Sequence, residues 1–157
     1  MTTEVLHVTN NNGSNTDELL KLLFKEQSLE HLLRYTEHSM DIPSFGEYIT
    51  ALTAEKGMTC EQVTKRANLE RSYGHKLYSG TRKPSRDTVL QLAFGLEADV
   101  DVAQKMLKYA CKSALYPKVK RDMVILYCLH NRISLTDTQI ILHDLKLPVL
   151  GKDSSDE

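Results

Sequence analysis

The most constraining feature of this sequence is a pair of short helical segments joined by a turn, within residues 59–80. The first segment begins at Thr59, and Gln62 follows at the spacing of a capping box. Asn68 comes after it, and asparagine tolerates the left-handed conformation that a tight turn needs. The second segment spans roughly 70–78. Two short helices joined by about three residues form the unit that places its second helix in a DNA groove.

A basic loop and a longer apolar helix follow this pair. The loop reads Thr81-Arg82-Lys83 and leads into Pro84. The next helix places four apolar side chains on one face, Val89, Leu92, Ala93 and Leu96. That spacing is typical of a helix packed on a core. The sequence therefore predicts a basic surface segment next to a buried helix.

The run RSYGHKLYSGTRKPSRDTVLQLAFGL, with the turn before it, resembles the phage-repressor-like (Xre or Cro/C1-type) helix-turn-helix proteins. The resemblance covers residues 44–101. It implies a lambda-repressor-like five-helix DNA-binding domain and a transcriptional regulator of bacterial or phage type. Members of this family usually carry an aliphatic residue where Gly74 stands. We interpret Gly74 as a site of close backbone packing, with Tyr73 or Tyr78 filling the space.

Charge is unevenly distributed along the chain, although the net charge is only -1. Residues 1–43 carry three basic and seven acidic residues, whereas residues 56–86 carry eight basic and two acidic residues. Phosphate binding depends on a local basic patch rather than on the total charge. The segregation therefore favours a nucleic-acid partner for the central segment.

The remaining chain reads as helical, so the predicted fold class is all-α with short helical extensions. We expect a disordered start and two acidic amphipathic helices, capped by Asn15 and Ser28, in residues 1–43. The helix-turn-helix domain is expected at 44–101, and a C-terminal helical extension with a solvated tail at 102–157. No internal repeat is evident.

Four helices outside the central pair can be placed by their caps, by a proline or by apolar spacing. Ser44 and Asp99 are expected caps of helices that flank the pair. The apolar run 123–129 is consistent with a buried strand or a buried helix, and a helix starting near Pro117 is favoured. A last helix is expected to begin at Ser134, with an apolar side made of Ile140, Ile141 and Leu145.

No sequence pattern supports catalysis or a bound cofactor. HExxH, GxSxG, P-loop and GxGxxG patterns are absent, so we expect no enzyme activity, no cofactor and no metal. The three cysteines lack CxxC spacing and are expected to be reduced thiols, although Cys60, near a helix start, is a hypothetical reactive thiol. No signal peptide or membrane span is found, which predicts a cytoplasmic protein.

The candidate DNA-binding residues lie on the second short helix, on the basic loop and at the start of the first helix. They are Cys60, Arg71, Ser72, Tyr73, His75, Lys76, Thr81, Arg82 and Lys83. Arg71, with its fork of donors, suits base edges such as guanine, whereas Arg82 and Lys83 suit phosphates. The alternative is a charged face that is simply solvated.

We therefore predict a regulator that binds double-stranded DNA, expected as a homodimer because specific binding normally uses two half-sites. Excess leucine and isoleucine in 19–33 and 135–147 would supply the dimer contact. The alternative is an antitoxin-like or adaptor module that binds a protein partner through its N- or C-terminal helices. A basic run at 105–121 is either an auxiliary phosphate-binding strip or a solvated face.

Overall fold

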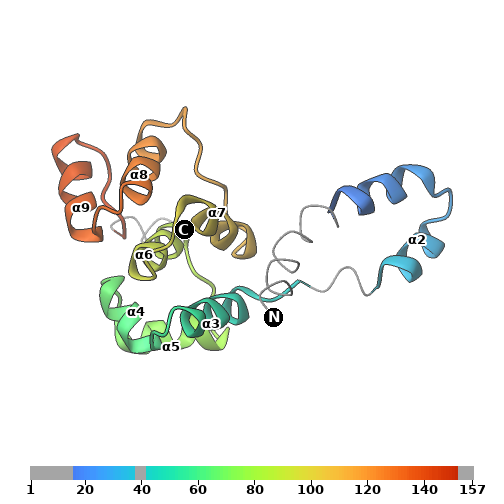
Figure 1. Cartoon of the computed structure of the whole chain (residues 1–157), viewed down its shortest axis with the longest axis horizontal. Helices are drawn as coiled ribbons and strands as arrows, with labels where there is room; N and C mark the ends of the chain where they lie inside the picture. The colour runs from blue at the N-terminus through green and yellow to red at the C-terminus, as the bar shows by residue number, and fades with distance from the viewer. Residues whose placement is uncertain (1–15, 38–41, 152–157) are drawn as a thin grey trace, which may run out of the picture. The chain divides into compact units, whose positions relative to one another are not determined.

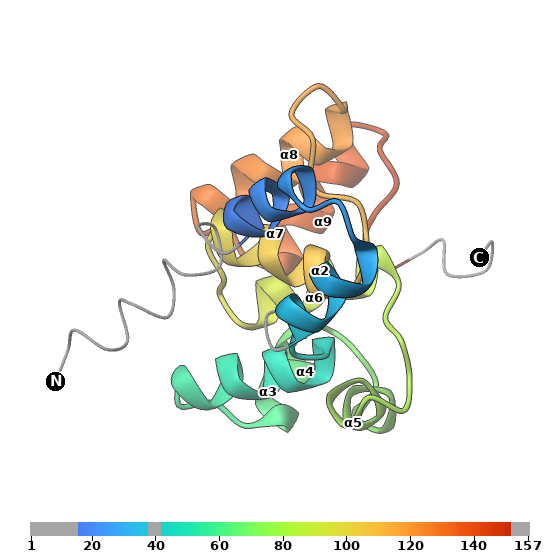
Figure 2. The ribbon, with the colours of Figure 1, turned by 90° about the vertical axis from the view of Figure 1, so that its right-hand side faces the viewer.

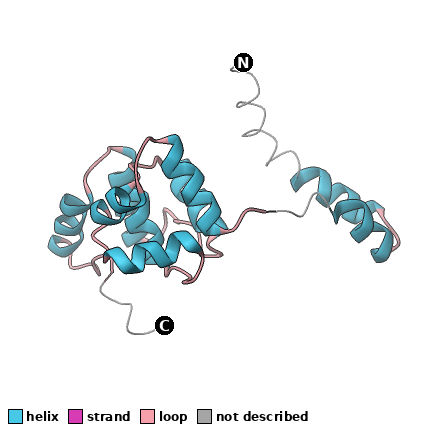
Figure 3. Ribbon diagram, turned by 90° about the horizontal axis from the view of Figure 1, so that it is seen from below, coloured by secondary structure: helices cyan, strands magenta, loops and turns pink. Residues whose placement is uncertain are grey.

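The structure is a computed structural model that describes residues 16–37 and 42–151. The chain divides into two compact units, with the division between Ile42 and Pro43 (Figure 1). All regular secondary structure in the described ranges is helical, as the colouring of Figure 3 shows. The prediction of an all-α protein is therefore confirmed.

The N-terminal unit contains a helix at residues 16–25 and α2 (Leu29–Thr36). Ser28 caps α2, because its side-chain oxygen accepts a hydrogen bond from the His31 amide at 3.4 Å. This confirms the predicted second cap. The predicted cap Asn15 and the expected disordered start lie outside the described residues.

The second unit contains seven described helices. They are α3 (Phe45–Glu55), α4 (Cys60–Arg66), α5 (Arg71–Ser79), α6 (Arg86–Gly95), α7 (Val100–Tyr109), α8 (Lys120–His130) and α9 (Leu135–Asp144). In this unit α6 lies in the middle, with α3, α4 and α5 on one side and α8 and α9 on the other (Figure 2). Every residue of α6 from Thr88 to Gly95 is buried, so this helix is the centre of the core.

The predicted helix starts are confirmed by the hydrogen bonds of their caps. Ser44 and Glu47 form a complete capping box at α3, and Thr59 and Gln62 form another at α4. Asp99 caps α7 by accepting from the amide of the third helical residue. The four side chains predicted for the buried face of α6 are all fully buried, Val89, Leu92, Ala93 and Leu96.

Helix α8 differs from its prediction in two respects. A helix is correct, but it begins at Lys120 rather than near Pro117, because Tyr116–Val119 forms a turn first. The apolar run 123–129 is not buried on all sides. Met123 is 55% exposed and Tyr127 is 61% exposed.

The buried face of α9 was predicted incorrectly. The helix does begin after Ser134, which caps it. Its buried side chains are Leu135, Thr138 and Leu142. Of the predicted apolar side, only Ile141 is partly buried, whereas Ile140 and Leu145 are exposed. Helix α9 has two possible buried faces. Packing against the neighbouring helices buries the face that contains Thr138.

The expectation that the chain contains no internal repeat is wrong. The hairpin α6–α7 with its tail, residues 86–116, recurs as the hairpin α8–α9 with its tail, residues 121–151. Equivalent residues are 35 apart in the sequence, as in Gln104 and Gln139. The turn residues Glu97 and Arg132 occupy equivalent positions and have left-handed φ values of 52° and 55°.

Both hairpins fix their tails with the same hydrogen bonds. The Gln104 side chain bonds the amide and the carbonyl of Leu115, at 2.8 and 2.9 Å. The Gln139 side chain bonds the amide and the carbonyl of Leu150 in the same way, at 2.7 and 2.8 Å. Both leucines are buried. Each hairpin therefore folds its own tail back onto itself with a glutamine.

Reciprocal ion pairs join the two hairpins. Arg86 donates two hydrogen bonds to Asp122, at 3.0 and 2.8 Å, and Arg121 donates two to Asp87, at 3.0 and 2.9 Å. We call these four residues the Arg–Asp clamp. Each hairpin thus supplies an arginine to the other hairpin's aspartate. Reciprocal contacts of this kind are those of a local twofold axis. Two copies of one motif therefore face each other inside a single chain.

Candidate nucleic-acid interface

The turn between α4 and α5 has the predicted left-handed residue. Asn68 has φ 56°, and the Leu69 amide donates to the Thr64 carbonyl at 3.0 Å. This bond pattern closes the C-terminus of α4 in the Schellman manner. Helix α5 then starts at Arg71. The turn thus fixes the direction in which the second helix leaves the first.

The two helices approach each other most closely at Gly74. A Cβ atom on this residue would lie 2.3 Å from Thr64 Oγ1 and 2.4 Å from its Cγ2 atom. No side chain larger than hydrogen fits there unless the helices move apart. The interpretation of Gly74 as a site of close packing is confirmed, but the side chain that occupies the space is Thr64 of α4 rather than Tyr73 or Tyr78.

The tyrosines on either side of this contact anchor α5 to its neighbours. The Tyr78 hydroxyl bonds Thr53 Oγ1 of α3 at 2.7 Å, and the Tyr73 hydroxyl lies 3.5 Å from Thr88 Oγ1 of α6. Burial raises the pKa of Tyr78 to about 12, more than the hydrogen bond to Thr53 lowers it. The phenol of Tyr78 is therefore neutral at physiological pH.

The outward face of α5 is polar and largely basic. Arg71, Ser72, His75 and Lys76 are exposed, whereas Leu77 is buried on the opposite side. Among the described residues, no hydrogen bond or ion pair engages the side chains of Arg71 and Lys76. These two cations are available to a partner.

The loop after α5 is held in an extended path while its basic side chains remain exposed. Thr81 Oγ1 bonds Ser79 Oγ at 2.8 Å, and the Arg82 amide donates to the Lys76 carbonyl at 3.1 Å. Pro84 is buried. The Arg82 and Lys83 side chains are exposed and have no ion-pair partner within the described ranges. The loop is thus a rigid support for two cations.

Cys60 and His75 form a contact between α4 and α5 that the sequence did not indicate. The Cys60 sulfur lies 4.0 Å from His75 Nδ1, and His75 Nε2 lies 3.3 Å from a Glu61 carboxylate oxygen. Burial raises the pKa of Cys60, and the Glu61 charge adds to this effect. Cys60 is therefore a neutral thiol at physiological pH and a packing contact for His75.

Two arginines assigned to basic surfaces by the sequence belong to the Arg–Asp clamp instead. Arg86 also donates to the carbonyls of Ser113 and Ala114, at 3.0 Å each. Arg121 donates to the carbonyls of the equivalent tail residues, Pro148 and Val149. Neither guanidinium is free for phosphate. The other cations of the basic run are exposed or partly exposed lysines, Lys105, Lys108, Lys112, Lys118 and Lys120.

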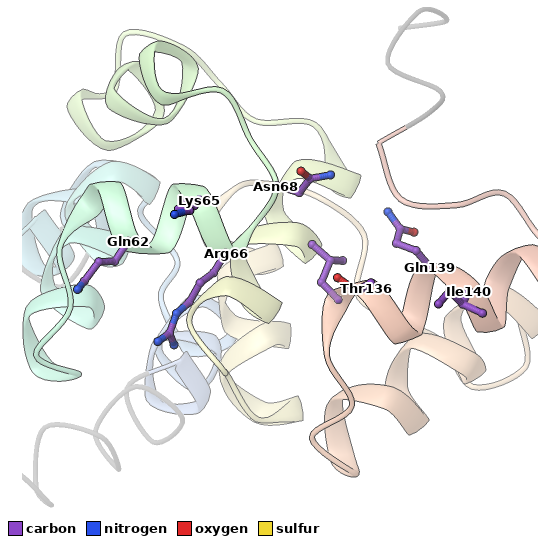
Figure 4. A pocket seen from close by; sticks show the side chains of 8 residues that line it. Gln62, Lys65, Arg66, Asn68, Thr136, Gln139 and Ile140 are labelled. Atoms are coloured by element: carbon purple, nitrogen blue, oxygen red, sulfur yellow. The ribbon is translucent and has the colours of Figure 1, made fainter.

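A groove of about 760 Å³ lies between α4 and α9 (Figure 4). Lys65 and Arg66 line it from α4, and Gln139 and Ile140 line it from α9. Arg66 is paired with Glu97 at 3.2 Å. The lining offers amides and cations but no carboxylate, thiol or imidazole.

Other classes of site were sought in the described ranges. Residues 16–37 and 42–151 contain no group of three or more metal-ligating side chains, and none of their helices has the length and apolar character needed to cross a membrane. All three cysteines are free thiols. No protein-family model, no curated protein and no solved structure matches this chain.

Proposed function

We propose that the second unit is a sequence-specific DNA-binding module of the lambda-repressor-like kind, acting as a transcriptional regulator. Helix α5 would enter the major groove, and the loop after it would contact phosphates. The five helices α3 to α7 would form the family's domain. The Xre resemblance of the sequence is part of the same proposal.

The observation that carries the proposal is that some basic side chains of this unit are fully paired within the protein, whereas those of α5 and the loop after it are not. In the clamp arginines Arg86 and Arg121, each of the three guanidinium nitrogens donates to a carboxylate or a carbonyl. The cations of α5 and its loop have no internal partner among the described residues, although α5 itself is rigidly held. Phosphate recognition requires unpaired cations on a fixed support.

The proposal assigns separate roles to the side chains on this surface. Arg71, at the start of α5, would reach base edges. Lys76 follows Ser72 by one turn, so it lies on the adjoining part of the exposed surface of α5. Arg82 and Lys83 would contact phosphates. Glu61 and Glu70 lie next to this face and hold His75 and Ser72. They would reject registers in which a phosphate approaches these two side chains.

The test is DNA binding measured by fluorescence anisotropy at several salt concentrations. Arg71→Ala should lose about 1–3 kcal/mol of specific binding, whereas Lys83→Ala should reduce the salt slope by about one unit on every sequence. Lys146→Asn is a matched control, because it removes one cation from the tail of α9 and keeps a residue that tolerates the left-handed φ of 59°. Parent-like binding by both variants would refute the proposal.

The rival function is a protein-interaction module. It is favoured by the exposed apolar side chains of α8, Met123 and Tyr127. Met123→Ser with Tyr127→Ser would leave DNA affinity unchanged if the DNA proposal is right. Absence of salt-dependent DNA binding by the parent chain would favour the rival.

A further inference from the structure

The helix at residues 16–25 has an apolar face that its own unit leaves uncovered. Leu20 is 47% exposed, Leu23 is 49% exposed and Phe24 is 81% exposed. Their spacing of three and four residues places them on one side of the helix. Leu19 and Leu22, on the neighbouring side, are partly buried. The exposed face is therefore a continuous stripe.

Helix α2 adds to this surface and does not cover it. Its buried side chains are only Leu32 and Thr36, whereas Leu29, Leu33 and Tyr35 are exposed. Isolated helices shorter than about 12–15 residues are marginal in water, and their stability comes from covering an apolar face. Two helices of this length with so little buried between them need a further partner.

The charges of the helix at 16–25 are separated along its length. Asp17 and Glu18 lie in its first turn, and Lys21 and Lys25 lie toward its C-terminal end. None of the four takes part in an ion pair among the described residues. A second helix with the same sequence complements this pattern only when it runs in the opposite direction.

We propose that residues 16–37 form a self-association surface, in which the helix at 16–25 packs antiparallel on the same helix of a second copy of this chain. The antiparallel arrangement brings Asp17 and Glu18 of one copy to Lys21 and Lys25 of the other, twice per dimer. The helix dipoles also oppose each other favourably in this direction. A parallel pair would place like charges together.

The surface lies outside the unit proposed to bind DNA, so the two proposals can fail separately. A dimer whose second unit does not bind DNA would leave this inference intact. DNA binding by a chain that stays monomeric up to about 100 μM would leave the DNA proposal intact and overturn this one.

The first experiment is sedimentation velocity of the full chain from about 5 to 100 μM, a range that detects micromolar self-association. The parent should be a dimer at the upper end of the range. Leu20→Asp with Leu23→Asp should be monomeric throughout. Ile140→Asp is the control, because it places the same charge on an exposed apolar site of α9 and should dimerise like the parent.

The second experiment tests direction by charge reversal. Asp17→Lys with Glu18→Lys should weaken the dimer about tenfold, and so should Lys21→Glu with Lys25→Glu. Mixing the two variants should restore association, because one helix is then wholly basic and its partner wholly acidic. Circular dichroism and the Tm of each variant check that the chain remains folded.

Three results would overturn the inference. The first is a parent chain that is monomeric at about 100 μM, the concentration at which the inference predicts a dimer. The Leu20, Leu23 variant could dimerise like the parent. The mixed charge variants could associate no better than either does alone, which excludes the antiparallel contact.

Discussion

Replacing Gly74 by alanine has two opposing effects on the free energy of unfolding. Alanine gains about 1 kcal/mol in helix propensity over glycine. The new Cβ atom would however meet Thr64 Oγ1 at 2.3 Å and its Cγ2 atom at 2.4 Å, both well inside van der Waals contact. Overpacking of this kind costs about 1–3 kcal/mol, since α4 or α5 must move. We expect Gly74→Ala to lower the free energy of unfolding by about 1 kcal/mol.

Thr64→Ala removes the two closest of the three clashing atoms and leaves only its own Cβ atom, at 2.9 Å, so the two substitutions should be coupled. On its own it loses a hydrogen bond from Thr64 Oγ1 to the Cys60 carbonyl, 2.7 Å long, and should cost about 1 kcal/mol. In the double variant only the contact between the two Cβ atoms remains, at 2.9 Å, so most of the overlap is relieved and a small shift of the helices allows the helix propensity of alanine to contribute. A coupling energy of about 1–2 kcal/mol should appear in urea denaturation of the four proteins.

Ser72→Ala, on the exposed face of α5, is the control for a gain of helix propensity away from the close contact, and it also loses the exposed hydrogen bond from Ser72 to Glu70. It should change the free energy of unfolding by less than about 0.5 kcal/mol. Should Gly74→Ala prove more stable than the parent, or should the two substitutions add without coupling, the close approach of α4 and α5 at this point is refuted. Measuring DNA affinity on the same proteins would show whether displacement of α5 also weakens binding.

Three further predictions concern charge. Burial raises the pKa of Asp122, but the hydrogen bonds from Arg86 and the Tyr116 amide, together with the charges of Arg86 and Arg121, outweigh burial, so the pKa lies below its ordinary value. The contribution of Asp122 to stability is therefore present above the unfolded pKa of about 4 and is lost as the pH falls through the folded value. Asp122→Asn should flatten this loss of stability in acid, measured by urea denaturation at a series of pH values. Tyr78, with its pKa of about 12, should be among the last tyrosines to ionise in a pH titration followed by absorbance at 295 nm. Its contribution to stability should fall as the pH rises from about 10 to 12, and Tyr78→Phe should remove this loss. If the basic run contacts DNA, Lys118→Gln with Lys120→Gln should reduce the salt slope by about one to two units without changing sequence preference, and an unchanged slope would assign these lysines to solvent.

The features that the sequence predicted correctly depend on neighbours within a few residues. Ser44 and Thr59 cap their helices because the residue three positions later is of the matching type. Asn68 and Gly80 adopt left-handed φ values for local steric reasons. The candidate residues on α5 could also be placed, because Leu77 marks its buried side.

The features that the sequence did not reveal depend on distant partners. Nothing near Arg86 in the sequence separates it from Arg82, since both are arginines of the same basic segment. Arg86 is paired because it reaches Asp122, which is distant in the sequence. Which stripe of α9 is buried is decided in the same way, by the helices around it. The sequence does not reveal the repeat, because few of its equivalent positions are identical. They are Arg86 and Arg121, Asp87 and Asp122, Val89 and Val124, Gln104 and Gln139, Leu107 and Leu142, and Leu115 and Leu150.

The Arg–Asp clamp makes the C-terminal hairpin part of the mechanical support of α5. Asp87 accepts from Arg121 and also from the Gly151 amide, so the last described residue is tied to the first turn of α6. Gln91 of α6 in turn donates to the Ala67 carbonyl, where α4 ends and the turn to α5 begins. A chain of hydrogen bonds thus runs from the tail to the turn before α5. If opening of the tail changes the orientation of α5, the tail is linked to the proposed binding of DNA. A ligand that loosened the tail would then change the DNA affinity by the same free energy with which DNA stabilises the tail.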